Sequence, residues 1–293
     1  MSAAVPETAR WTDAVLGVRR IEDIPGSHWL WYPIAIRSAT EMDYESLARD
    51  VHRFLDGSED ARDRSWIAPF EATQVWVEGG DPLQVIEAAL TIPGLIPVAI
   101  ADLHMYRSLY ANYPPRSDVE AARLAVRLLE EVDGIAVPVA YGFLAAAARD
   151  DAELALAAIS RAEELVELQD DAFMAASVAA FGAMAILSLA TPLAARHCRE
   201  RLERLQPHFN NVSVSLLSVC LSLLRRVDDP TAPILHAFLM STPGCAASAR
   251  IVDPGLPDID PLLYAGVAYD EVLQMTRDAL DRLIDADLAE NQR

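Results

Sequence analysis

The sequence predicts a mainly α-helical protein of stacked helical hairpins, either an α-solenoid or an α/α-toroid, with a short α+β segment at its N-terminus. Three observations predict this class. Residues typical of helix starts recur from Asp81 onward. The segments between them alternate between amphipathic and wholly apolar, and strand-like sequence patterns are confined to residues 1–80. A helix that is apolar all round must be covered on every side, whereas an amphipathic helix can face water. Inner and outer helices are therefore expected to alternate.

Residues 1–80 are expected to form an aromatic-rich segment with a small strand pair. All five tryptophans lie in this segment. It also holds two runs rich in aromatic and branched residues, 29–37 and 73–77, which are typical of strands. Between these runs, Thr40 starts a pattern of apolar residues at helical spacing that stops at Gly57, and this pattern predicts a helix.

Residues 81–240 form the expected helical-hairpin core, and residues 241–293 a long loop with a capping helix. Polar and proline residues typical of helix starts punctuate the core at Asp81, Ser117, Asp150 or Asp151, Asp170, Thr191 and Asp229. The stretch 241–261 is rich in Pro, Gly and Asp, which predicts a loop, and 269–288 predicts the last helix, with its apolar side covering the end of the stack.

Part of the core resembles a degenerate tetratricopeptide-like repeat. Successive amphipathic helices are expected to begin near Asp118, Ala152 and Pro192, a spacing in the range of paired-helix repeats. The segment YGFLAAAARDDAELALAAISRAEEL places the small residues Ala155 and Ala162 seven apart, as that family does. The resemblance covers about residues 118–226, and the family's Trp, its Leu-Gly pair and its closing Pro are missing from the expected places. It implies a scaffold that binds other proteins.

Charge composition narrows the classes of partner. The 24 basic residues are all Arg, and 44 acidic residues bring the formal net charge to −20. Such a field repels phosphate backbones and anionic membrane surfaces and favours a basic protein partner. We therefore expect no nucleic acid and no membrane as partners. Because the chain has no Lys, a Walker A loop, a pyridoxal phosphate Schiff base and an amine nucleophile are excluded.

No motif indicates a cofactor or a metal. The three cysteines lack C-x-x-C spacing and the six histidines lack zinc-site spacing, so no cofactor and no metal are expected. Reduced thiols and the absence of an export signal predict a cytoplasmic protein. The uncharged run 172–190 has nearly the length of a membrane span, but its Ala, Ser and Gly content favours a buried helix.

Two stretches supply the candidate binding residues. The first is the N-terminal aromatic group with its nearby cation, Trp29, Trp31, Tyr32 and Arg37; on a strand, Trp29 and Trp31 would share one face. The second is a dense polar and aromatic stretch in which Asp102 is followed by His104, Tyr106, Arg107 and Tyr110. Both groups are also open to a purely structural interpretation, as the seal of one end of the stack and as an aromatic seam.

Two functions from different classes remain open. The first hypothesis is a non-catalytic helical-repeat protein that binds a basic protein, as an immunity protein or a regulatory adaptor does. The alternative is a small-molecule enzyme with a helical cavity for a hydrophobic ligand, such as an isoprenoid or polyketide cyclase. The acidic pairs Asp150-Asp151 and Asp170-Asp171 invite comparison with class I terpene cyclases, although neither completes that family's motif and both suit helix capping.

Overall fold

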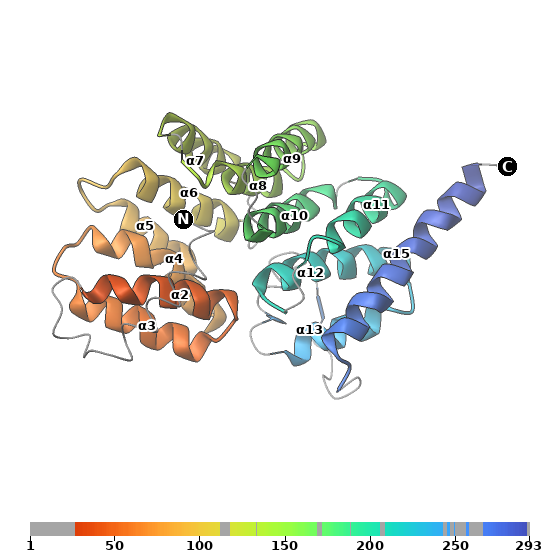
Figure 1. Cartoon of the computed structure of the whole chain (residues 1–293), viewed down its shortest axis with the longest axis horizontal. Coiled ribbons are helices and arrows are strands. Elements are labelled where there is room, and N and C mark those ends of the chain that lie inside the picture. Colours follow the sequence, from red (N-terminus) through yellow and green to blue (C-terminus); the bar gives the residue numbers. More distant parts are fainter. Residues whose placement is uncertain are drawn as a thin grey trace. The chain divides into compact units, whose positions relative to one another are not determined.

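The protein is all-helical throughout the part of the chain that the structure describes. The computed structural model describes residues 27–111, 118–132, 134–168, 172–187, 189–205, 209–242, 245–246, 249, 256–257 and 266–291. Within these residues thirteen α-helices and one 3-10 helix pack against one another, and no strand is formed (Figure 1). The predicted all-α class is confirmed.

The helices divide between two compact units, Met1–Ala140 and Tyr141–Arg293. The division falls inside one helix, α8, which spans Val137–Ala147. The three segments expected from composition cut the chain at different places, near residues 80 and 240, and stay a prediction.

Unit 1 is a stack of helical hairpins. Its elements are η2 (Ser27–Leu30), α2 (Trp31–Thr40), α3 (Tyr44–Gly57), α4 (Asp63–Val77), α5 (Pro82–Leu90), α6 (Pro97–Ala111) and α7 (Val119–Glu131). Helix α2 packs against α3, α4 against α5, and α6 against α7 (Figure 1). The first helices of these pairs also meet, because α4 contacts both α2 and α6. One row of helices, α2, α4 and α6, therefore runs through the unit.

Unit 2 repeats this packing with more deeply buried helices. Its elements after α8 are α9 (Ala152–Glu167), α10 (Ala172–Ile186), α11 (Thr191–Leu202), α12 (Asn211–Arg226), α13 (Ala232–Ser241) and α15 (Tyr269–Asn291). Helix α10 contacts α9, α11 and α12, and most of α12 is buried. Helix α15 packs against α11, α12 and α13, as expected of a helix that caps the stack.

Side-chain caps begin many of these helices where the sequence predicted them. Asp81 and Asp151 each accept a hydrogen bond from a backbone N–H in the first turn, at 3.0 and 3.1 Å. Helix α7 is capped by Asp118, at 3.0 Å, one residue after the expected Ser117. Such a bond satisfies one of the donors that a helix start leaves unpaired. The expected starts at Ser117 and Asp170 lie outside the described residues.

The predicted strand pair is wrong. Residues 29–37 lie in η2 and α2, and residues 73–77 are the last turn and a half of α4. Pro33 stands in the first turn of α2, where a missing N–H costs nothing. Gly79 follows α4 with φ +83°, so Gly79 and Gly80 end a helix rather than a strand.

The uncharged run at 172–190 forms α10 and the loop after it. No helix in the described part of the chain has both the length and the apolar character needed to cross a membrane. Most of the expected loop 241–261 lies outside the described residues, although residues 245, 246 and 249 are helical.

Candidate functional site

The N-terminal aromatic residues gather into one cluster, which we call the Trp29 cluster: Trp29, Tyr32, Phe54, Trp66 and Phe70. The Trp29 ring lies 5.3 Å from Phe54 on α3 and 6.3 Å from Trp66 on α4, in edge-to-face contacts. The ring of Tyr32, which follows Trp29 by three residues, lies 6.1 Å from the Trp29 ring. These three ring contacts hold Trp29 in a fixed orientation. Even so, 39% of the residue is exposed.

Trp31 packs against the core that contains Phe54 and Phe70, but it does not share a strand face with Trp29, because both residues are helical. The guanidinium of Arg53 lies over the Trp31 ring, 4.4 Å from its centroid, a cation–π contact within the chain. The charge of Arg37 favours the ionised form of Asp50, whose carboxylate accepts a hydrogen bond from the Ser38 hydroxyl at 2.8 Å. Burial raises the pKa of Asp50, and the bond from Ser38 and the nearby guanidinium groups partly offset this rise.

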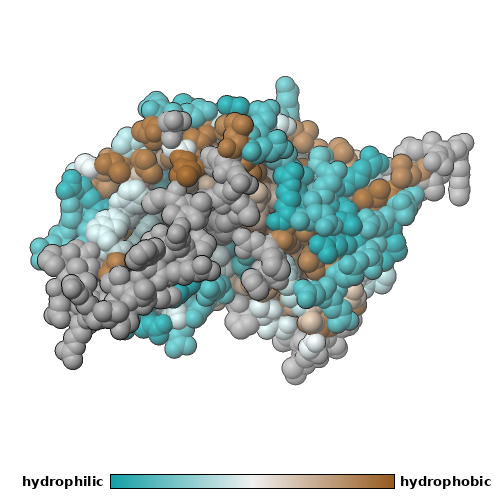
Figure 2. Space-filling model, viewed as in Figure 1, coloured by the Kyte–Doolittle hydropathy of each residue, from teal (hydrophilic) through white to brown (hydrophobic). Residues whose placement is uncertain are grey.

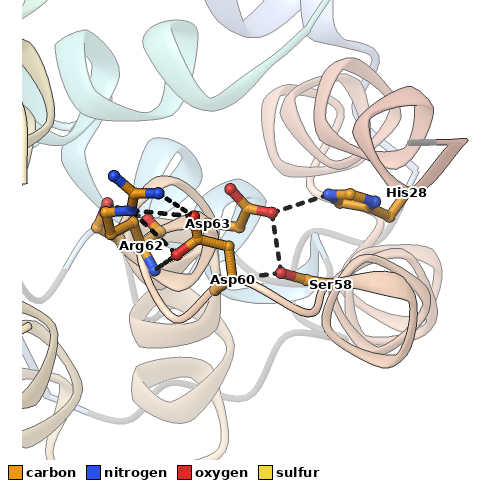
Figure 3. Close-up of polar contacts among 6 residues, drawn as sticks. His28, Ser58, Asp60, Arg62 and Asp63 are labelled. Carbon is orange, nitrogen blue, oxygen red and sulfur yellow. Dashed lines mark hydrogen bonds and ion pairs between the residues drawn. The ribbon is translucent and has the colours of Figure 1, made fainter. Parts of the chain in front are cut away.

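A hydrogen-bond network anchors the helix that carries Trp29. His28 Nε2 lies 2.9 Å from Asp63 Oδ2, and the Ser58 hydroxyl lies 3.0 Å from the same oxygen (Figure 3). In a nucleophilic triad the histidine would bond the serine hydroxyl and take up its proton. Here Ser58 and His28 both bond the carboxylate, so the arrangement joins η2 to the start of α4 and does not activate Ser58.

The stretch on α6 splits between two faces of the helix. Tyr106 and Tyr110 lie four residues apart on one face, with ring centroids separated by 6.2 Å. The Tyr110 ring is 6.0 Å from Trp76, and its hydroxyl is 2.7 Å from the hydroxyl of Thr73. This face of α6 therefore meets α4.

His104 and Arg107 lie on the side of α6 that meets α7. Arg107 Nε is 3.2 Å from the Asp118 carboxylate, at the N-cap of α7. Burial lowers the pKa of His104, and the neighbouring Arg107 lowers it further. Nδ1 of His104 is buried and has no hydrogen-bond partner among the described residues. These two residues are predicted site residues that the fold separates from the tyrosines.

Asp102 connects the two predicted groups. It precedes Tyr106 by four residues on α6, and burial raises the pKa of its carboxyl to about 7. Burial and then the charge of Asp102 raise the pKa values of Tyr32 on α2 and of Tyr106. Both helices that carry these residues, α2 and α6, pack on α4.

The site residues predicted from the sequence include neither Asp102 nor Phe54 and Trp66 of the Trp29 cluster. The spacing of Asp102, Tyr106 and Tyr110 at four-residue intervals was the signal for the α6 face, since such residues line one side of a helix. No comparable signal links Phe54 and Trp66 to Trp29, because these contacts depend on how three helices pack.

The features compared with cyclase metal motifs have structural roles where the structure describes them. Asp151 caps α9, and Asp150 beside it is exposed. The pair Asn210-Asn211 is the one feature of the sequence that resembles the second metal motif of those cyclases, and it lacks the downstream Glu. Its Asn210 side chain caps α12 through the backbone N–H of Ser213, at 3.0 Å. Asp170-Asp171 lies outside the described residues. Within the described part of the chain, no three His, Cys, Asp or Glu side chains converge as metal ligands would.

The surface of unit 1 mixes apolar and polar residues. On the face shown in Figure 2, hydrophobic residues gather over α6 and α7. Ile96, Val132 and Ile135, in the loops that flank these helices, are 52%, 42% and 48% exposed. Trp29 is the aromatic residue among the large exposed hydrophobic side chains of the described chain.

Comparisons with known proteins supply no family for the chain. No family model matches it, and neither a curated protein nor a solved structure is significantly similar to it. Since a fold class alone does not determine a function, the function has to be argued from the residues of the site.

Proposed function

We propose that this protein is a non-catalytic helical-repeat protein that binds a basic protein partner through the Trp29 side of unit 1. The exposed indole of Trp29 carries this proposal. Tryptophan is enriched among the residues that dominate protein interfaces, and here it is held on three packed helices by its contacts with Tyr32, Phe54 and Trp66. A rigid, half-exposed aromatic residue loses little conformational entropy when a partner covers it.

Charge supports a basic partner. The net charge of −20 attracts cationic proteins over several ångströms and raises their rate of encounter. Asp56, Glu59 and Asp60 follow Phe54 in the chain, and Gly57 abuts His28, so these carboxylates lie near Trp29. An aromatic anchor bordered by acidic side chains suits a basic segment.

The architecture supports the same proposal. Stacked hairpins present a row of helices to a partner, and the tetratricopeptide-like resemblance of residues 118–226 points to the same use. We propose that the protein acts in the cytoplasm, where the buried free thiols of Cys198, Cys220 and Cys245 would stay reduced.

The proposal is tested by capture from the host followed by a binding measurement. The tagged protein is used to isolate a stoichiometric partner, and the affinity of that partner is compared between the wild type and Trp29→Ala. We expect Trp29→Ala to weaken binding by at least about tenfold, the effect of removing an interface anchor. Leu168→Ala, at a side chain that is 84% exposed in unit 2, is the matched control and should bind as the wild type does.

Trp29→Phe separates a lost contact from a disturbed cluster. Phenylalanine retains the edge-to-face packing on Phe54, so it should fold normally and bind with intermediate affinity. If no basic partner is captured, or if Trp29→Ala binds it as tightly as the wild type, the proposal is wrong.

A small-molecule enzyme remains the second candidate, favoured by one observation. Burial raises the pKa of the Asp102 carboxyl to about 7, which suits a general acid or base. Mass spectrometry of the purified protein under non-denaturing conditions would favour this candidate if a small hydrophobic molecule were retained by the wild type and not by Asp102→Asn.

A further inference from the structure

Trp29 lies in an element that has little structure of its own to hold it. The 3-10 helix η2 has four residues, Ser27–Leu30, and α2 follows it directly at Trp31. A single 3-10 turn has poorer hydrogen-bond geometry than an α-helix. The direction in which the Trp29 indole leaves this turn therefore depends on side-chain contacts, and the neighbouring His28 supplies contacts to both α3 and α4.

One side of His28 is bonded to the start of α4. His28 Nε2 lies 2.9 Å from Asp63 Oδ2, and the hydroxyl of Ser58 donates to the same oxygen at 3.0 Å (Figure 3). The side chains of His28 and Asp63 are only 13% and 16% exposed. A polar contact that is shielded from water in this way is stronger than the same contact at an exposed surface.

The other side of His28 lies against the end of α3. The His28 ring makes an edge-to-face contact with Phe54, with 5.4 Å between the ring centroids. A Cβ added to Gly57 would lie 2.8 Å from Cβ of His28, which is too short for two carbon atoms that are not bonded. Because glycine has no Cβ, it allows η2 to approach α3 this closely. His28 is thus held between α3 and α4.

We infer that His28 is the positioning residue of Trp29, and that Gly57 and Asp63 hold His28 in place from either side. His28 and Trp29 are adjacent in one turn, so a displacement of His28 changes the direction of the indole. While His28 is held, the indole keeps one orientation and 39% of the residue stays exposed to a partner. A binding residue that is already ordered loses less entropy when a partner covers it.

This inference deepens the proposed function and rests on it only for the link to binding. The positioning of Trp29 by His28 is a property of the chain alone and is measured without a partner. The alternative role for Asp63 is to stabilise the start of α4, where a carboxylate interacts favourably with the helix dipole. That role alone would change the stability of the protein and leave the surroundings of Trp29 as they are.

The test is fluorine-19 NMR on the full chain labelled with 5-fluorotryptophan at its five tryptophans. The signals that are lost in Trp29→Phe and in Trp76→Phe assign these two residues. We expect Asp63→Ala to move the Trp29 signal toward its position in the urea-unfolded chain, while the signal of Trp76, which packs on Tyr110, stays in place. Asp63→Asn keeps an oxygen that can accept both hydrogen bonds, so it should restore the wild-type signal.

Two further variants make the test specific. Gly57→Ala acts on the opposite side of His28, since the added Cβ must displace it, and should also move the Trp29 signal. Asp81→Ala is the matched control, because it removes another carboxylate from a helix start in unit 1, one that accepts a hydrogen bond from the backbone N–H of Leu83. The lost cap should lower Tm and leave the Trp29 signal unchanged.

The inference is overturned if the Trp29 signal keeps its wild-type position in Asp63→Ala or in Gly57→Ala, or if Asp81→Ala moves it as far as they do. A partner captured through Trp29 should bind Asp63→Ala about threefold to tenfold more weakly than the wild type. Failure of the proposed function has a different signature. If the Trp29 signal responds as expected but Trp29→Ala binds the captured partner as tightly as the wild type, His28 positions Trp29 and the proposed binding role is wrong.

Discussion

At the scale of single residues, burial and hydrogen bonding decide what each polar side chain of unit 1 can do. Asp50, His28 and Tyr110 all have partners within the chain, at 2.8, 2.9 and 2.7 Å. Asp102 has burial without a partner. The difference marks Asp102 as a carboxyl whose protonation state changes near neutral pH.

Replacing Asp102 by Asn should stabilise the protein more at pH 8 than at pH 5. The folded-state pKa of about 7 lies above the ordinary value of 3.8, so the folded protein holds a proton that the unfolded chain releases between these values. The wild type therefore loses stability as the pH rises through this window. The gain for Asp102→Asn should be larger at pH 8 than at pH 5 by on the order of 2–3 kcal/mol. Urea unfolding at both pH values measures it, and equal stabilities at pH 8 would contradict the desolvation of Asp102.

Replacing Thr73 by Val should cost more stability than replacing Tyr110 by Phe. The Thr73 hydroxyl donates to the Pro69 carbonyl at 2.9 Å, so the Tyr110 hydroxyl must donate to Thr73. Thr73→Val leaves the buried phenol unpaired, at a cost of about 1–3 kcal/mol, whereas Tyr110→Phe removes the group that needs a partner and costs about 0.5–1.5 kcal/mol. The double variant tests this coupling, since its cost should be smaller than the sum of the two.

At the scale of helices, residue spacing and capping residues predicted where helices begin. Residue composition did not distinguish a helix from a strand. The caps at Asp81 and Asp151 were predictable because a short polar side chain precedes an apolar stripe, whereas α7 is capped by Asp118 and not by the predicted Ser117. Strands were predicted for residues 29–37 and 73–77 because aromatic and branched residues favour strands in general. In unit 1 they pack equally well on the buried faces of α2 and α4, so tertiary contacts overrode the local preference.

Two glycines of unit 2 should respond oppositely to replacement by Ala. A Cβ on Gly142 of α8 would lie 3.2 Å from Cβ of Phe181 on α10, which is closer than ordinary contact, whereas a Cβ on Gly182 would meet Arg201 at 3.4 Å and Ile159 at 3.5 Å. Gly182→Ala should gain part of the roughly 1 kcal/mol by which Ala exceeds Gly in a helix. Gly142→Ala should destabilise, by about 1–3 kcal/mol, because α8 and α10 must move apart.

Thermal unfolding of both glycine variants provides the comparison. A higher Tm for Gly182→Ala than for the wild type, together with a lower Tm for Gly142→Ala, is the expected order. The reverse order would show that α8 and α10 do not approach as closely as the contact between Phe143 and Phe181, 4.2 Å between ring centroids, indicates.

At the scale of the whole molecule, charge and helical stacking were predictable from the sequence, and the meeting of distant residues was not. The net charge follows from residue counts, and the alternation of helices follows from local sequence patterns. The contacts of Tyr32 with Trp66 and Phe70 join residues more than thirty positions apart, and the sequence has no pattern that encodes the packing of α2 on α4. The separation of His104 and Arg107 from the tyrosines likewise follows from the packing of α7.

The absence of Lys makes one measurement unusually direct. A carbodiimide joins a carboxylate to a nearby amine, and in a complex of this chain with its partner every link to a lysine must use a lysine of the partner. We predict that links formed with the captured partner map to Asp56, Glu59 or Asp60 beside the Trp29 cluster and are lost in Trp29→Ala. Links confined to residues 141–293, or links that persist in Trp29→Ala, would contradict the claim that the protein binds a basic partner through Trp29.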